Sequence, residues 1–348
     1  MTPVCQPPGA RDVEAGGAGT EHSSARLTRP APVEPYARIM TTTQGIEVEH
    51  VGRSFGDVHA VRDASFIAEP GTVTALIGPN GSGKTTLMLM LASLLRPDSG
   101  TIRIGGFDPS EKTAEVRSLL GWMPDVLGSW SSLSVRTTLE ITGRLYRLDK
   151  AASAARAHEL LALVGLEHLA GQPTRVLSRG QKQRLSLARA LVHDPSILLL
   201  DEPASGLDPA ARADLRTLVR RLASEGKTVL VSSHVLAELD EMADGAVYIG
   251  AGVTASTETM AATRSTLRSW RIKATDGAAL ETALVASGIA PADIGRDRTE
   301  LLVALEGEAA ASELLAKLVS AGVLVSTFAP AVGDLEHTFL DLSKGSNR

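Results

Sequence analysis

The chain has 348 residues, which is enough for one large domain and a smaller one. Its formal net charge of −5 argues against a dedicated nucleic-acid binder, because such domains usually carry a basic excess. The single cysteine, Cys5, excludes an internal disulfide framework and fits a reducing compartment. No stretch approaches the roughly 18 apolar residues that cross a bilayer, so a role at a membrane would need a separate spanning chain.

The N-terminal segment, residues 1–44, is mostly rich in Pro, Gly, Ala and Ser and lacks a hydrophobic period, so we predict that it is disordered. Met40 stands just before the first expected strand, 46–51. Two interpretations stay open, a disordered tail or a translation start at Met40. Neither changes the chemistry below.

Residues 45–256 alternate between patterns of strands and helices. Apolar, β-branched runs at 72–77, 196–200 and 227–232 are typical of strands buried on both faces, and a helical pattern at 84–95 follows the first. This alternation predicts an α/β domain with a mostly parallel sheet covered by helices. Within it, residues 110–176 favour helix and predict an inserted helical subdomain.

The pattern restarts after residue 256 and predicts a small C-terminal α/β domain at 257–348. We expect strands at 270–274, 301–306 and 323–328, with helices at 278–286 and 309–318 between them. This second domain contains no motif that we identify as catalytic.

A phosphate-binding pattern lies between an expected strand and an expected helix. Residues 78–85, Gly-Pro-Asn-Gly-Ser-Gly-Lys-Thr, match G-x-x-x-x-G-K-[ST]. Glycines let backbone N–H groups approach phosphate oxygens closely, and the following helix directs its N-terminal dipole at the same anion. Lys84 adds a positive charge for the β- and γ-phosphates, and the Thr85 hydroxyl can bind Mg²⁺. An ordinary glycine-rich turn is the alternative, and the position between strand and helix argues against it.

A second acidic motif follows the apolar run 197–200, where Asp201 and Glu202 end an expected buried strand. A carboxylate at such a position is costly unless it meets a cation or water. We predict that Asp201 binds Mg²⁺ and that Glu202 orients or deprotonates the attacking water. Taken alone, the two acids would more often be a solvated strand end, but phosphoryl transfer needs such partners for the phosphate loop.

Residues 177–181, Leu-Ser-Arg-Gly-Gln, resemble the signature sequence of ABC ATPases, commonly LSGGQ. Other segments fall in the order of that family: Phe55 resembles the aromatic that stacks on adenine, 205–208 resembles the D-loop, and His234 resembles the switch histidine. The resemblance covers about 45–256 and implies the P-loop NTPase fold of ABC ATPases, with ATP as the bound nucleotide. The nucleotide-binding residues that it implies are Phe55, Gly78, Pro79, Asn80, Gly81, Ser82, Gly83, Lys84, Thr85, Thr86, Asp125, Ser178, Gly180 and Gln181.

The resemblance also implies how these residues would work. Glu202, His234 and Lys84 would be catalytic, and Thr85 and Asp201 would hold Mg²⁺. Such ATPases pair head to tail with a second copy or a related ATPase, so that Ser178 and Gly180 would serve the partner's ATP.

Two positions depart from the family pattern. Asp125 stands where the family usually has a glutamine, and it lacks the amide that could donate a hydrogen bond to water. Arg179 replaces the glycine at the third position of the signature. Its guanidinium could approach the partner's phosphates or point to solvent.

The resemblance is greatest to the ATPases of drug and antibiotic exporters. It implies a separate transmembrane permease, a location in the cytoplasm on the inner face of the cell membrane, and no nucleic-acid partner. The alternatives are the ATPase subunit of an importer and a soluble ABC ATPase without a transport role. The sequence does not specify the cargo.

Overall fold

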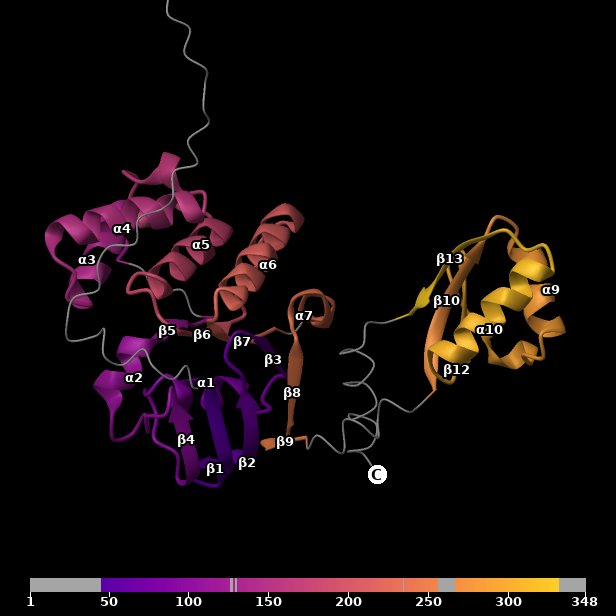
Figure 1. Cartoon of the computed structure of the whole chain (residues 1–348), viewed down its shortest axis with the longest axis horizontal. Helices are drawn as coiled ribbons and strands as arrows, with labels where there is room; N and C mark the ends of the chain where they lie inside the picture. The colour runs from indigo at the N-terminus through magenta and orange to yellow at the C-terminus, as the bar shows by residue number, and fades with distance from the viewer. Residues whose placement is uncertain (1–44, 126–127, 129, 234, 256–266, 332–348) are drawn as a thin grey trace, which may run out of the picture. The chain divides into compact units, whose positions relative to one another are not determined.

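The computed structural model describes residues 45–125, 128, 130–233, 235–255 and 267–331. The predicted disorder of 1–44 and the predicted switch residue His234 lie outside these residues. The described residues form a nine-stranded sheet with its helices and a four-stranded sheet with two α-helices (Figure 1).

The nine-stranded sheet combines a parallel centre with an antiparallel margin. Its strands are β1 Ile46–Phe55, β2 Val58–Ala68, β3 Val73–Ile77, β4 Ser99–Ile104, β5 Leu120–Met123, β6 Ile197–Asp201, β7 Thr228–Ser232, β8 Gly245–Gly250 and β9 Val253–Thr254. They lie in the order β4-β1-β2-β9-β8-β3-β7-β6-β5. Strands β8, β3, β7, β6 and β5 run parallel, whereas β1 pairs antiparallel with both β2 and β4. The predicted, mostly parallel sheet is therefore present.

Every residue of β3, β6 and β7 is buried, which explains why their sequences are continuous apolar runs. The C-terminal ends of parallel strands meet at one edge of a sheet, where α/β proteins commonly bind ligands. The phosphate loop (78–85) follows β3, and Glu202 follows β6, so both lie at this edge.

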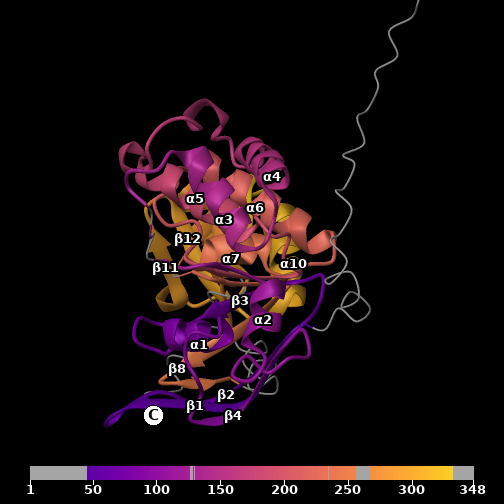
Figure 2. The ribbon, with the colours of Figure 1, turned by 90° about the vertical axis from the view of Figure 1, so that its left-hand side faces the viewer.

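The helices cover the sheet, and four of them have a side-chain N-terminal cap. They are α1 Lys84–Leu91, α2 Thr113–Leu119, α3 Val135–Leu145, α4 Lys150–Leu163, α5 Arg179–Ala190, α6 Pro209–Ser224 and α7 Leu236–Met242, with short 3₁₀ turns η1 Glu167–Leu169 and η2 Thr174–Val176. Ser134, Asp149, Ser178 and Asp208 each cap a helix by accepting a backbone N–H. Helices α3, α4 and α5 pack together (Figure 2).

One part of the segment predicted to be helical is a strand. Residues Leu120–Met123 form β5 and pair in parallel with β6, so the helical segment 110–176 is interrupted by a strand of the main sheet. The segment Leu-Gly-Trp-Met is short and apolar, and such a run cannot be assigned to helix or strand by periodicity alone.

The four-stranded sheet is antiparallel and lies in the C-terminal part of the chain. Its elements are β10 Arg268–Ala274, α9 Gly277–Ala286, η3 Pro291–Asp293, β11 Ile294–Asp297, β12 Glu300–Leu305, α10 Gly307–Ser320 and β13 Val325–Pro330. The strand order is β11-β12-β10-β13, and its core contains Ile272, Leu284 and Leu318. The sequence did not predict β11, because three of its four residues are exposed and form no apolar run.

Candidate nucleotide site

The phosphate loop connects β3 to α1 through glycines with unusual backbone angles. Gly81 has φ 78° and Gly83 has φ 104°, a region that side chains with a Cβ rarely adopt. Lys84 begins α1, and its Nζ donates hydrogen bonds to the carbonyl oxygens of Gly78 at 2.6 Å and Pro79 at 3.1 Å. The ammonium group therefore lies against the loop in which a phosphate would bind.

Two glycines of the loop, Gly78 and Gly83, have no room for a side chain. A Cβ on Gly78 would lie 2.6 Å from Ser82 Oγ, and a Cβ on Gly83 would overlap the carbonyl oxygen of Ala60 on β2. Ser82 is 3% exposed, and its Oγ has no hydrogen-bond partner in the described part of the chain. A buried hydroxyl without a partner beside backbone N–H groups is suited to an oxygen-rich anion.

Lys84 lies between opposing electrostatic influences. Burial lowers the pKa of its amine, whereas the carboxylates of Glu202 and Asp201 raise it. Asp201 and Glu202, at the end of β6, therefore both interact electrostatically with the lysine of the phosphate loop. Two motifs separated by more than 100 residues in sequence thus meet at one site.

Asp201 is the last residue of β6 and is 4% exposed. Burial raises the pKa of its carboxyl, the Asp125 carboxylate raises it further, and Ser232 and Lys84 lower it. The Ser232 hydroxyl, on the neighbouring strand β7, donates a hydrogen bond of 2.5 Å to Asp201 Oδ1. The predicted residue Asp125 therefore lies close enough to Asp201 to interact electrostatically.

Glu202 has a left-handed backbone with φ 51°, which is unusual for a residue other than glycine. Its N–H donates to the Ser232 carbonyl oxygen at 3.1 Å. Its carbonyl oxygen accepts hydrogen bonds from Gln183 Nε2 at 2.7 Å and from the Ser205 N–H at 3.1 Å. Strained conformations of this kind persist where the surroundings hold them, and they are common at active sites.

The signature segment (177–181) leads into helix α5. Ser178 and Gln181 form a capping box, with Ser178 Oγ accepting from the Gln181 N–H at 3.2 Å and the Ser178 N–H donating to Gln181 Oε1 at 2.9 Å. Arg179 Nη2 donates to Ser205 Oγ in the D-loop (205–208) at 2.7 Å. The guanidinium is thus bonded to its own chain rather than directed only at solvent.

The remaining predicted residues lie on the phosphate loop, on α1, at the end of β1 and at the start of α5. Thr85 and Thr86 are in the first turn of α1, with Thr85 exposed, and Asn80 is exposed on the loop. Phe55 ends β1 and is 49% exposed. The hydrogen bonds of Ser178 and Gln181 stay within the capping box, so these residues do not complete the loop of their own chain.

Sequence reasoning missed Gln183 and Ser232, which position Glu202 and Asp201. Gln183 is 2% exposed, and a polar residue on the buried face of an amphipathic helix could have been noticed. Ser232 ends an apolar run and gave no comparable signal.

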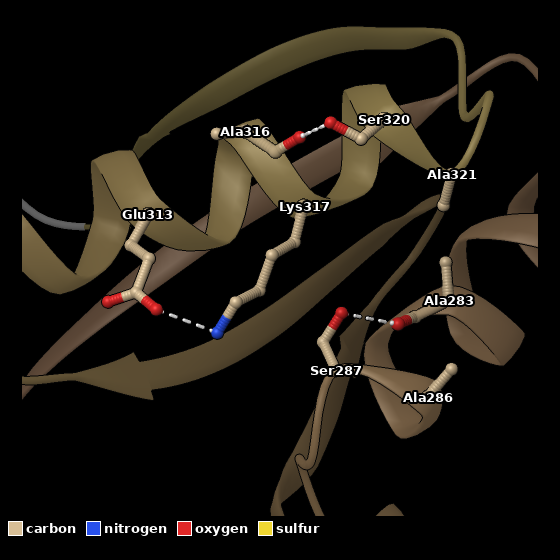
Figure 3. A pocket seen from close by; sticks show the side chains of 8 residues that line it. All are labelled: Ala283, Ala286, Ser287, Glu313, Ala316, Lys317, Ser320 and Ala321. Carbon is tan, nitrogen blue, oxygen red and sulfur yellow. Dashed lines mark hydrogen bonds and ion pairs between the residues drawn. The ribbon is translucent and has the colours of Figure 1, made fainter.

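A hollow of about 560 Å³ lies between α9 and α10 in the four-stranded domain (Figure 3). The hydroxyls of Ser287 and Ser320 bond to carbonyl oxygens of their own helices, and Lys317 pairs with Glu313 at 2.8 Å. The polar groups that line the hollow are therefore already satisfied, and nothing here defines a binding site.

Comparisons with known proteins agree with this geometry. The family model described as ABC transporter matches residues 61–205. The ABC transporter ATP-binding protein NatA of Bacillus subtilis is 37% identical over 196 residues, covering 56% of this chain and 80% of NatA. The Nod factor export ATP-binding protein I of Burkholderia lata is 38% identical over 207 residues, covering 60% of this chain and 68% of the relative.

A solved structure shares the fold of the nine-stranded part. The dimeric post-hydrolysis structure of the ATP-binding cassette MJ0796, bound to ADP and Pi, superimposes with a TM-score of 0.56 at 25% identity. The match covers 61% of this chain and 97% of the cassette. In the described part of this chain, no helix is both long and apolar enough to span a membrane.

Proposed function

The chain belongs to the ATP-binding proteins of ABC transporters, and on that premise we propose that it works as one half of a head-to-tail dimer that powers export through a separate membrane-spanning permease. The ATPase activity follows from the family. The observation that carries the site assignment is the convergence of Lys84, Asp201 and Glu202 at one sheet edge.

Lys84 and the loop N–H groups would bind the phosphates of ATP. The Lys84 ammonium now bonded to Gly78 and Pro79 would offset the charge of the β- and γ-phosphates. Glu202 would accept a proton from the attacking water, and its constrained backbone would keep that carboxylate in place. His234 would hold the γ-phosphate, as the family resemblance implies.

Mg²⁺ fits the donor set of this edge. The Thr85 hydroxyl and the Asp201 carboxylate are hard oxygen ligands, and Mg²⁺ commonly binds through one or two such groups plus substrate phosphates. When bound, Mg²⁺ would neutralise charge developing on the β- and γ-oxygens. Ser232 would orient the Asp201 carboxylate for this role through the 2.5 Å hydrogen bond.

The second copy, or a related ATPase, would complete the site. Ser178 and Gly180 stand at the N-terminus of α5, where backbone N–H groups and the helix dipole favour an anion. The Ser178 side chain is hydrogen-bonded within its own capping box, which leaves the helix end to face a partner's nucleotide. The similarity to a dimeric cassette bound to ADP and Pi supports this arrangement.

The direction and place of transport are inferred from relatives. The Nod factor relative carries export in its name, which favours an exporter over an importer for this chain. The subunit would then lie in the cytoplasm, on the inner face of the cell membrane. The drug or antibiotic class of cargo stays a prediction.

Co-purification from membranes tests the proposal. An affinity-tagged chain, extracted with mild detergent, should co-purify with a protein that has membrane-spanning helices. ATP hydrolysis by the preparation should depend on the presence of both proteins. The complex is then reconstituted into vesicles with ATP on the outside. An exporter would move its cargo into the vesicle lumen, whereas an importer would move it out. Recovery of an active ATPase without a membrane protein, in the presence and absence of ATP, would favour the soluble alternative.

A further inference from the structure

Phe55 stands at the exposed end of β1 with a cation over its ring. The Arg53 guanidinium carbon lies 4.9 Å from the ring centroid, within the range of a cation–π interaction. Residues two apart on a strand point to the same face, which brings these side chains together. Since the guanidinium covers one face of the ring and Phe55 is still 49% exposed, the opposite face remains available.

Asp98 fixes Arg53 in this position. Its Oδ1 pairs with Arg53 Nη1, and its Oδ2 accepts the Ser54 N–H at 2.7 Å. The Asp98 N–H in turn donates to the Gly52 carbonyl oxygen at 2.8 Å. The Ser54 N–H and Arg53 lower the pKa of Asp98, which favours its charged form. The arginine is therefore anchored to the segment before β4 and not free in solvent.

Arg53 lies on the strand face that borders the phosphate loop. It pairs directly with Val61 of β2 in the antiparallel register, and paired residues share a face of the sheet. A Cβ on Gly83 would lie 3.2 Å from Val61 Cγ2, which places Val61 against the loop. The arginine, the ring and the phosphate loop thus follow one surface of the β1–β2 pair.

We propose that Arg53 is a positioning residue for the nucleotide base: anchored by Asp98, its guanidinium covers one face of Phe55 and holds the ring so that the base stacks on the other. This inference rests on the proposed binding of ATP with its base at Phe55. A ring at an exposed turn would otherwise lose rotational freedom on binding, and an ordered ring avoids part of that cost.

The test compares a ligand that has a base with one that lacks it. The affinities of MgATP and magnesium tripolyphosphate are measured by calorimetry for wild type and for Arg53→Met, which keeps an unbranched apolar side chain. MgATP should bind about two- to fivefold more weakly to the variant. Tripolyphosphate should bind equally, and the turnover number should be unchanged while KM for ATP rises. Arg53→Lys should recover part of the loss.

A double-mutant cycle shows whether Arg53 acts through the ring. In a Phe55→Leu background, Arg53→Met should have no further effect on MgATP affinity. An equal effect in both backgrounds would mean that Arg53 contacts the nucleotide directly, which overturns the proposal. Equal losses for MgATP and tripolyphosphate, or no loss for either, would also overturn it.

Two further variants keep the result interpretable. Asp98→Asn should weaken MgATP binding in the same direction and provides an independent test if Arg53→Met folds poorly. Arg296→Met removes an exposed ion pair with Glu281 in the four-stranded domain and should change neither affinity. A different result would be that wild type binds MgATP no more tightly than tripolyphosphate and that Phe55→Leu binds MgATP as tightly as wild type does. That result would contradict stacking of the base on Phe55, and this inference with it.

Discussion

Glu202 has a left-handed backbone, and its N–H and C=O groups are hydrogen-bonded to Ser232, Gln183 and Ser205. If its carboxylate is the general base, Glu202→Gln should reduce the ATPase rate by about 10²- to 10⁴-fold, the usual contribution of a positioned base. Glutamine has nearly the same shape, so ATP binding should persist. ATPase assays and nucleotide-binding measurements check both expectations.

The same variant should accumulate as an ATP-bound dimer, because hydrolysis could no longer release it. Light scattering coupled to gel filtration, with and without MgATP, measures that association. A Glu202→Gln protein that hydrolyses ATP at the wild-type rate would remove Glu202 from the role of base.

At the residue scale, the sequence motifs predicted the residues of the site but not the residues that hydrogen-bond to them. Lys84, Asp201 and Glu202 belong to spaced patterns whose chemistry is readable, and the structure brings them together. Gln183 donates a hydrogen bond to the Glu202 carbonyl oxygen, and Ser232 is hydrogen-bonded to both Asp201 and Glu202. No spacing rule identifies such a contact, because it depends on how α5 and β7 pack against the end of β6.

Arg179 joins the start of α5 to the D-loop within one chain, at the candidate dimer face. Its Nη2 bonds to Ser205 Oγ, and its stem lies against Gly206, where a Cβ would come within 2.6 Å of Arg179 Cδ. Arg179→Gly should therefore loosen the D-loop and lower the free energy of unfolding by about 1–2 kcal/mol, from a lost charged hydrogen bond and a glycine in the helix. Because glycine is common at this signature position, ATPase activity should survive.

Hydrogen exchange at residues 205–208 and urea unfolding measure these effects. Lys182→Ala, on the same helix, is the matched control and should leave the exchange of this segment unchanged. Unaltered exchange in Arg179→Gly would show that the bond to Ser205 does not restrain the D-loop.

A half-buried histidine, His193, lies between the end of α3 and the segment after α5 and should make stability depend on pH. His193 stacks on Tyr146 with ring centroids 3.7 Å apart, and its Nε2 lies 3.2 Å from the Leu120 carbonyl oxygen. Burial lowers the pKa of His193 from 6.5 to about 4, partly opposed by the Leu120 carbonyl. The folded protein thus binds fewer protons than the unfolded chain between these two values.

Stability should accordingly fall as the pH decreases from about 6.5 towards 4, by about 2 kcal/mol at pH 5 from this group. His193→Phe keeps a flat ring and removes the titration, so its unfolding free energy should change less between pH 7.5 and pH 5. Urea titrations measure the difference, and the exposed His168→Gln should behave like wild type. Equal pH dependence in wild type and His193→Phe would assign the acid sensitivity elsewhere.

At the element scale, continuous apolar runs were predictable, whereas the long strand β2, in which buried and exposed residues are mixed, and several short strands were not predicted. The three buried strands β3, β6 and β7 were evident because both faces are apolar. Strand β5 was assigned to a helical segment, and β11 was missed. Both have four residues, so their pairing with β6 and β12 decides their conformation rather than their own sequence.

At the scale of the whole molecule, the site should be shared between two chains. Lys84→Ala disables the phosphate loop, and Ser178→Asp preserves a good helix cap while placing a negative charge where the partner's phosphate is expected. Each variant alone should therefore form dimers with two defective sites. A mixed dimer would contain one site with both defects and one site with none.

Mixing the two inactive variants in equal amounts should restore activity. Random exchange makes half of the dimers mixed, and one of two sites in each is intact, so about a quarter of the wild-type ATPase rate should return if the sites act independently. Each variant incubated with more of itself is the control. If Lys84 and Ser178 instead served the same site within one chain, every chain in the mixture would keep its own defect, and mixing would restore nothing.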